Sequence, residues 1–183
     1  HFIDWTSPNN LPIEPETFDM LFDDALDMIG KHNRLYVTDR VIGADSRYAL
    51  PVSLITDRAL STLFIDNMFR PVPGDIDRSV FYQKDFMLIA LPYNKLQSEK
   101  YKGRLRQMPD GSTSDLVVAV DFDRRMGIVI GSAYMGSMKK LMFTVMNYYL
   151  PLEGILPLHC SANEGSDGRS ALLLGLSGTG KTS

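Results

Sequence analysis

The chain ends in a glycine-rich stretch whose residue types fit a phosphate-binding loop. Residues 175–182 match the pattern G-x-x-x-x-G-K-[ST], in which glycines let successive backbone N–H groups converge on a phosphate. In such a loop Lys181 would reach the β- and γ-phosphates, and the Thr182 hydroxyl would contact Mg²⁺. The apolar run 171–174 predicts the buried strand that leads into such a loop. The alternative is a glycine-rich turn between two strands, which leaves the Lys181-Thr182 pair unexplained.

Three further groups could take part in chemistry, and each has a simpler structural alternative. Lys139 and Lys140 lie near the start of a predicted helix, where positive charge meets the unfavourable end of the helix dipole. Taken alone, such a pair is more often a solvated basic pair on a helix surface. His159 lies in the apolar segment 155–162, and a histidine on a strand is more often a hydrogen-bonded core residue than a ligand. Tyr134 lies in a loop bracketed by glycines and could be a packing residue.

The apolar periodicity predicts the elements that must position these residues. Helical spacing predicts helices over residues 15–30, 57–69 and 138–149, of which the last is closed by Pro151. The apolar face of the first helix comprises Phe18, Leu21, Phe22, Ala25, Leu26 and Ile29. Strands are predicted over residues 35–38, 52–56, 86–91, 116–120, 126–130, 155–162 and 171–174. Strands 116–120 and 126–130 should pair antiparallel around a polar turn. This alternation predicts an α/β fold of the mixed, α+β kind.

Composition excludes several classes of function. The 183 residues carry a formal net charge of −3 and no basic stripe, which argues against binding nucleic acid or a membrane surface. No apolar run approaches the roughly 20 residues needed to span a bilayer. The single cysteine, Cys160, excludes an internal disulfide and suits a reducing compartment, so we expect the cytoplasm.

The last third of the chain resembles ATP-dependent phosphoenolpyruvate carboxykinase in the order and spacing of its motifs. The matching segments are GSAYMGSMKK at 131–140, FTVMNY at 143–148, LPLEG at 150–154, HCSAN at 159–163 and the loop at 175–183. A looser similarity covers residues 56–71, including NMF at 67–69. The resemblance implies that residues 1–154 form most of an N-terminal mixed-sheet domain of carboxykinase type. Residues 155–183 would begin a P-loop nucleotide-binding domain.

The resemblance also implies a reaction and a set of site residues. The family converts oxaloacetate and ATP to phosphoenolpyruvate, ADP and CO₂, a lyase (decarboxylase) and kinase reaction of gluconeogenesis. By position, Lys140 and His159 correspond to protein ligands of Mn²⁺, Lys139 to a lysine that holds substrate and γ-phosphate, and Tyr134 to a tyrosine beside the CO₂ pocket. The ATP-binding residues would be Ser177, Gly178, Thr179, Gly180, Lys181 and Thr182, with Thr182 on the nucleotide-bound Mg²⁺. The 183 residues alone should be an inactive fragment.

Two other functions are compatible with the sequence. One is another P-loop phosphotransferase of the HPr kinase type, which uses a similar loop, although the spacing from Lys139 and Lys140 to His159 argues against it. The other is a catalytically silent, carboxykinase-like nucleotide-sensing module. Departures from the family pattern at Met135 and Ser137, and in the stretch 51–53, motivate that second alternative.

Overall fold

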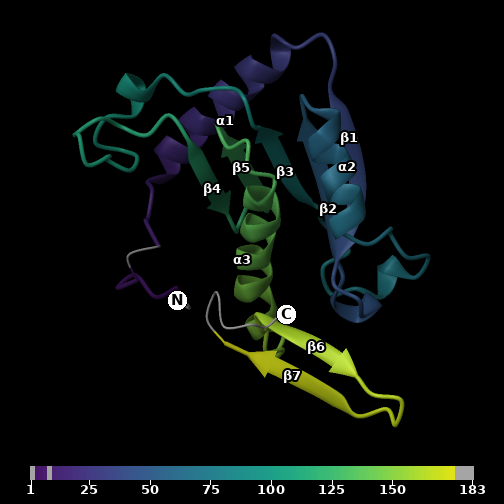
Figure 1. Cartoon of the computed structure of the whole chain (residues 1–183). Helices are drawn as coiled ribbons and strands as arrows, with labels where there is room; N and C mark the ends of the chain where they lie inside the picture. The colour runs from purple at the N-terminus through teal and green to yellow at the C-terminus, as the bar shows by residue number, and fades with distance from the viewer. Residues whose placement is uncertain (1–2, 8–9, 176–183) are drawn as a thin grey trace.

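The computed structural model describes residues 3–7 and 10–175, which form a five-stranded sheet with helices on both faces and a separate two-stranded hairpin (Figure 1). The predicted mixed α/β fold is confirmed. The elements in chain order are α1 (Pro15–Gly30), β1 (Tyr36–Ile42), β2 (Leu50–Thr56), α2 (Ala59–Met68), β3 (Phe86–Leu91), β4 (Val117–Asp121), β5 (Met126–Ile130), α3 (Gly136–Leu152), β6 (Cys160–Glu164) and β7 (Ser170–Leu174). Three short 3₁₀ helices lie in the connections, at Ser46–Tyr48, Ile76–Arg78 and Ser98–Tyr101.

The strand order in the large sheet is β1-β2-β3-β5-β4. The three central strands β2, β3 and β5 run parallel, whereas the outer strands β1 and β4 pair antiparallel with their neighbours, as predicted for β4 and β5. The parallel strands end at Thr56, Leu91 and Ile130, so their carboxyl ends lie along one edge of the sheet. Ligands of open α/β sheets bind at this edge.

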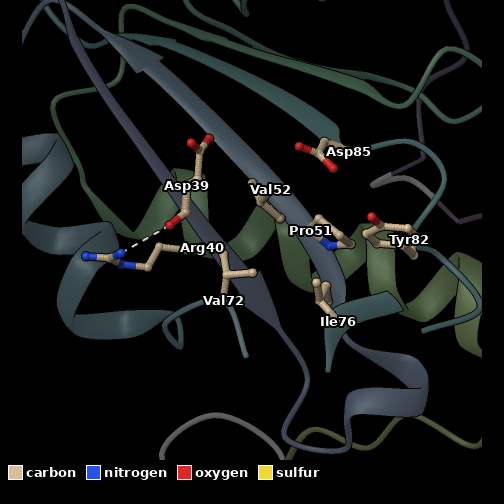
Figure 2. Close-up of a pocket in the computed structure, with 8 residues that line it drawn as sticks. All are labelled: Asp39, Arg40, Pro51, Val52, Val72, Ile76, Tyr82 and Asp85. Atoms are coloured by element: carbon tan, nitrogen blue, oxygen red, sulfur yellow. Dashed lines mark hydrogen bonds between the residues drawn. The ribbon is translucent and has the colours of Figure 1, made fainter. Parts of the chain in front are cut away.

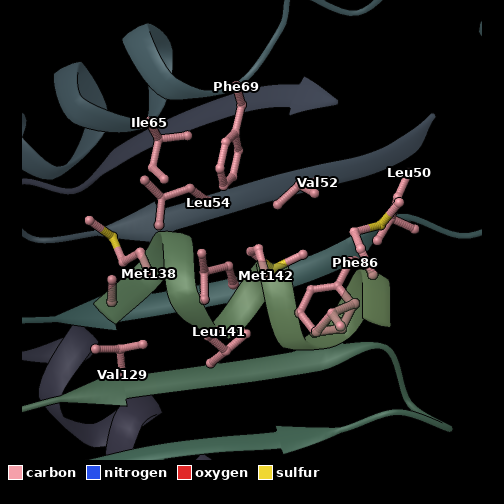
Figure 3. Close-up of a cluster of buried hydrophobic side chains, with 14 of the residues drawn as sticks. Leu50, Val52, Leu54, Ile65, Phe69, Phe86, Val129, Met138, Leu141 and Met142 are labelled. Carbon is pink, nitrogen blue, oxygen red and sulfur yellow. The ribbon is translucent and has the colours of Figure 1, made fainter. Parts of the chain in front are cut away.

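Helices α2 and α3 cover one face of the large sheet. The α3 residues that face the strands recur every three or four positions, as Met138, Leu141 and Met142 show (Figure 3). The side chains of Met142 and Val145 are completely buried. They pack against strand residues such as Leu54 and Phe86, and Ile65 of α2 joins the same cluster. Lys140 is exposed on the opposite side of α3, as its position relative to the apolar stripe predicts.

Helix α1 covers the other face, against β3, β4 and β5. It has the predicted bounds, because Pro15 at the first helical position forgoes no internal hydrogen bond. Phe18, Leu21 and Ala25 are buried in a cluster with sheet residues such as Ile128. The prediction for Leu26 is wrong, since 46% of this residue is exposed. Each residue advances about 100° around a helix, which carries Leu26 beyond the edge of the buried stripe.

Two predicted boundaries around α3 and β6 are also wrong. Helix α3 runs through Pro151 to Leu152, because the N–H groups of Glu153 and Ile155 return to the Leu150 carbonyl and complete the last turn. The strand predicted over 155–162 begins only at Cys160. Pro157 explains the late start, since proline has no N–H to donate to a strand ladder.

Strands β6 and β7 form an antiparallel hairpin that lies apart from the large sheet, beyond the end of α3 (Figure 1). The expectation that 171–174 is buried is wrong for the described structure, because Leu172, Leu173 and Leu174 are 52%, 47% and 64% exposed. No element among residues 3–7 and 10–175 covers this strand, so its side chains face solvent. Within the same described residues, no helix has both the length and the apolar character needed to cross a membrane.

Candidate active site

Three of the predicted site residues follow β5 at the carboxyl edge of the parallel strands. Tyr134 lies in the short connection between β5 and α3, and 71% of it is exposed. Lys139 and Lys140 lie in the first two turns of α3, the former half-buried and the latter exposed. The edge of the sheet and the start of α3 therefore present a phenol and two amines to solvent.

His159 reaches the same helix from the other direction. Its imidazole meets the ring of Phe143 edge-on, with the ring centroids 5.2 Å apart. Phe143 follows Lys140 by three positions, and side chains three positions apart lie on the same face of a helix. His159 is exposed and precedes β6, so it lies outside the strand predicted over 155–162, and the alternative of a core histidine does not hold. The segment between α3 and β6 thus returns the imidazole to the side of α3 that carries Lys140.

The donor atoms of Lys140 and His159 suit a divalent transition-metal ion. An uncharged amine and an imidazole both offer nitrogen, whereas Mg²⁺ and Ca²⁺ favour oxygen ligands. Across the part of the chain that the structure describes, no three or more His, Cys, Asp and Glu side chains gather into a potential metal site. Within the described residues, a metal ion at this site would therefore depend on the Lys140 amine and the His159 imidazole.

The predicted phosphate loop lies outside the described residues. Strand β7 leads toward it and the described structure ends at Gly175, so Ser177, Gly178, Thr179, Gly180, Lys181 and Thr182 are not among the residues whose geometry is known.

A buried carboxylate, not predicted from sequence, supports the carboxyl edge. Asp57 directly follows β2, and its side chain has no solvent exposure. Its Oδ2 lies 3.4 Å from His32 Nε2, 3.3 Å from Arg58 Nε and 3.3 Å from Asn94 Nδ2. These partners come from the segment after α1, the start of α2 and the segment after β3, so Asp57 ties three elements to the edge that carries Tyr134. The sequence signal is a charged residue placed at the end of an apolar strand.

The sheet also forms a cavity near β1 and β2, remote in sequence from the predicted site residues. It has a volume of about 310 Å³ and is lined by Asp39, Arg40, Pro51, Val52, Val72, Ile76, Tyr82 and Asp85 (Figure 2). The Ser53 hydroxyl donates to Asp39 at 2.7 Å and lies 3.5 Å from the Asp85 carboxylate. Arg40 extends away from both carboxylates and pairs with Asp66 of α2 at 2.8 Å. None of the predicted site residues lines this cavity.

Comparison with known proteins assigns the chain to a family. The sequence profile of the phosphoenolpyruvate carboxykinase family matches residues 1–183. The chain therefore belongs to the phosphoenolpyruvate carboxykinase family.

Three curated relatives are each called phosphoenolpyruvate carboxykinase (ATP). The protein of Geobacillus kaustophilus is 40% identical over 181 residues, which cover 98% of this chain and 32% of the relative. The protein of Bacillus pumilus is 37% identical over 182 residues (100% and 32%), and that of Thermus thermophilus 37% over 181 residues (97% and 32%). The chain thus spans about a third of the length of the curated relatives it matches.

Proposed function

We propose that this chain is part of an ATP-dependent phosphoenolpyruvate carboxykinase, comprising most of its N-terminal domain and the beginning of its nucleotide-binding domain. The reaction would be oxaloacetate + ATP → phosphoenolpyruvate + ADP + CO₂. The bond from C3 of oxaloacetate to its departing carboxylate breaks, and its electron pair forms an enolate. The enolate oxygen then takes the γ-phosphoryl group as the bond to ADP breaks. The observation that carries the proposal is the family match across all 183 residues.

The roles of individual residues belong to the same proposal. Tyr134 lies beside the carboxylate that leaves as CO₂, and Lys139 holds the substrate and the γ-phosphate through its positive charge. Lys140 and His159 bind Mn²⁺, and that ion would supply the positive charge that polarises the substrate carbonyl. The exposure of Tyr134 and Lys140, and the approach of His159 to the Lys140 side of α3, support this assignment.

The nucleotide would bind to the predicted phosphate loop. Residues 177–182 hold ATP, with Lys181 on the phosphates and Thr182 on Mg²⁺. The separate β6–β7 hairpin supports a division into an N-terminal domain over residues 1–154 and the start of a nucleotide-binding domain at 155–183. A cytoplasmic location fits the unpaired Cys160.

The test uses the full-length protein that carries this chain, assayed for phosphoenolpyruvate formation from oxaloacetate and ATP with Mn²⁺. We expect Lys140→Ala and His159→Ala each to weaken Mn²⁺ binding by at least about 10- to 100-fold, the loss typical of removing a group that only supports a metal ligand, with a parallel loss of activity. Electron paramagnetic resonance measures the Mn²⁺ binding. Lys95→Ala is the matched control, because Lys95 is an exposed lysine that pairs only at the surface with Asp115.

Two results would contradict the proposal. A protein that binds ATP but releases no CO₂ would be the silent module. Normal Mn²⁺ affinity in both the Lys140 and the His159 variants would show that these residues do not bind the metal ion. The activity assay would then test the proposed reaction separately.

A further inference from the structure

We propose that Gly136 is a positioning residue that sets the direction of the Tyr134 phenol. This inference rests on the proposed function, which gives the phenol its role beside the departing carboxylate. The ring of Tyr134 occupies the space that a side chain at Gly136 would need. A Cβ added to Gly136 would lie 2.5 Å from the Tyr134 hydroxyl oxygen, and closer still to the ring carbons Cζ and Cε1. The ring therefore folds back over the first residue of α3.

The backbone that carries Tyr134 is fixed at the sheet. The Gly131 N–H donates to the Leu91 carbonyl at 3.1 Å and joins the end of β5 to the end of β3. Gly131 has φ +80°, and a Cβ there would lie 3.0 Å from the Asp115 carbonyl oxygen. The chain leaves the sheet along one path, because only glycine fits this conformation and this close approach.

The same loop is closed on its helix side. The hydroxyls of Ser132 and Ser137 are 2.6 Å apart and bridge the two ends of the loop. The Ser137 N–H donates to the Tyr134 carbonyl at 2.9 Å, and the Ser61 hydroxyl of α2 contacts the Met135 sulfur at 3.7 Å. With the backbone held at both ends, the rotamer of Tyr134 decides where its hydroxyl lies.

Gly136 controls that rotamer without supporting the fold. Its backbone is helical, so alanine can adopt the same conformation and has the higher helix propensity. The three atoms nearest to such a Cβ all belong to the outer part of the Tyr134 side chain, which is mostly exposed and can turn into solvent. Gly136→Ala should therefore displace the phenol while leaving folding intact. Substitution of a residue with a merely structural role would instead lower stability and leave the direction of the phenol unchanged.

The displaced phenol should reduce catalysis. A catalytic group misplaced by about 1 Å can lower a rate on the order of 100-fold. A phenol beside the departing carboxylate also contacts CO₂ in the reverse, carboxylating direction. We expect Gly136→Ala to lower kcat/KM for CO₂ about 10- to 100-fold, with a melting temperature within ~3 °C of the unchanged protein.

The experiment compares four forms of the full-length protein with the unchanged protein: Gly136→Ala, Tyr134→Ala, the double variant, and Gly30→Ala. Gly30→Ala is the matched control, because Gly30 also lies in a helix and a Cβ there would meet no atom within 4 Å. We expect Gly30→Ala to keep full activity. In the Tyr134→Ala background, Gly136→Ala should cause no further loss, because the ring through which it acts is gone.

A second readout follows the ring directly. The protein is labelled with 3-fluorotyrosine, and the ¹⁹F resonance of Tyr134 is assigned by its disappearance in Tyr134→Phe. Gly136→Ala should shift this resonance, and Gly30→Ala should leave it in place. An unshifted resonance, or an equal further loss of activity in the Tyr134→Ala background, overturns the proposal. If the unchanged protein lacks carboxykinase activity, the proposed function fails, yet the ¹⁹F shift still decides whether Gly136 sets the ring direction.

Discussion

Strands β3 and β7 are similar in sequence and opposite in environment. β3 reads FMLIAL and β7 reads SALLL, and both are nearly continuous apolar runs. In β3, the residues from Leu88 to Leu91 are at most 1% exposed, because α1 lies on one face and α3 on the other. In β7 every residue is exposed. An apolar strand sequence therefore predicts that the strand has side chains to bury. Whether they are buried depends on the helices and strands that pack on its two faces.

The largest expected difference between these two regions is in the stability lost when one leucine is truncated. Leu88→Ala should destabilise the protein by about 2–5 kcal/mol, because it leaves a cavity between closely packed layers. Leu173→Ala should cost less than about 0.5 kcal/mol, since 47% of this residue is already exposed and its truncation opens no enclosed cavity. Urea unfolding of the 183-residue chain measures both. Equal losses would mean that β7 is as well packed as β3.

A second difference should appear at alkaline pH. Burial raises the pKa of Tyr149, on the covered face of α3, to about 12. Tyrosine in an unfolded chain titrates near pH 10, so the unfolded state loses this proton first as the pH rises. Stability is thus fully present below about pH 10 and should fall by about 2–3 kcal/mol as the pH rises through 12.

The free energy of unfolding, measured from pH 8 to 12, tests whether stability falls over this range. Tyr149→Phe should reduce the alkaline loss without abolishing it, because burial also raises the pKa of Tyr101. The substitution also removes the hydrogen bond that the Tyr149 hydroxyl donates to the Phe122 carbonyl. The exposed Tyr93 supplies the control, and Tyr93→Phe should leave the alkaline loss unchanged. An identical pH profile for the two variants would contradict the assignment to Tyr149.

The smallest expected difference is between two glycines, one in a turn of the large sheet and one on the connection to the hairpin. Gly43, in the turn between β1 and β2, has φ +111°, and a Cβ there would lie 3.0 Å from the Tyr48 carbonyl oxygen. Gly43→Ala should cost about 2–3 kcal/mol through backbone strain and this contact. Gly154, on the connection to the hairpin, has φ +72° and open space around it, so Gly154→Ala should cost only about 1 kcal/mol. Thermal unfolding of both variants tests the ranking, and a larger loss at Gly154 would reverse it.

Periodicity predicted the large sheet well because its physical signals are local. The α1 bounds, β3, and the β4–β5 pair all depend on apolar spacing and on residues such as Pro15 that fix a boundary. The late start of β6 has a local signal as well, since Pro157 lies within the predicted strand. The exposure of β7 has none, because burial depends on which elements lie nearby in space.

The candidate site was only partly predictable for the same reason. The resemblance to the carboxykinase family indicated Tyr134, Lys139, Lys140 and His159, and the structure brings the first three to the carboxyl edge of the sheet. The contact between His159 and Phe143 depends on the path of the chain after α3, and the place of Tyr134 over Gly136 depends on a rotamer. Neither is encoded in spacing along the sequence.

The strand order has a consequence for synthesis of the chain from its N-terminus. β5 is the last strand of the large sheet to be made, yet it lies between β3 and β4. Until residues 126–130 leave the ribosome, one side of β3 has no native neighbour, and its N–H and C=O groups on that side lack their partners. The nascent polypeptide must carry this open, strongly apolar strand edge through the synthesis of some forty residues, the interval in which pairing with another chain is easiest.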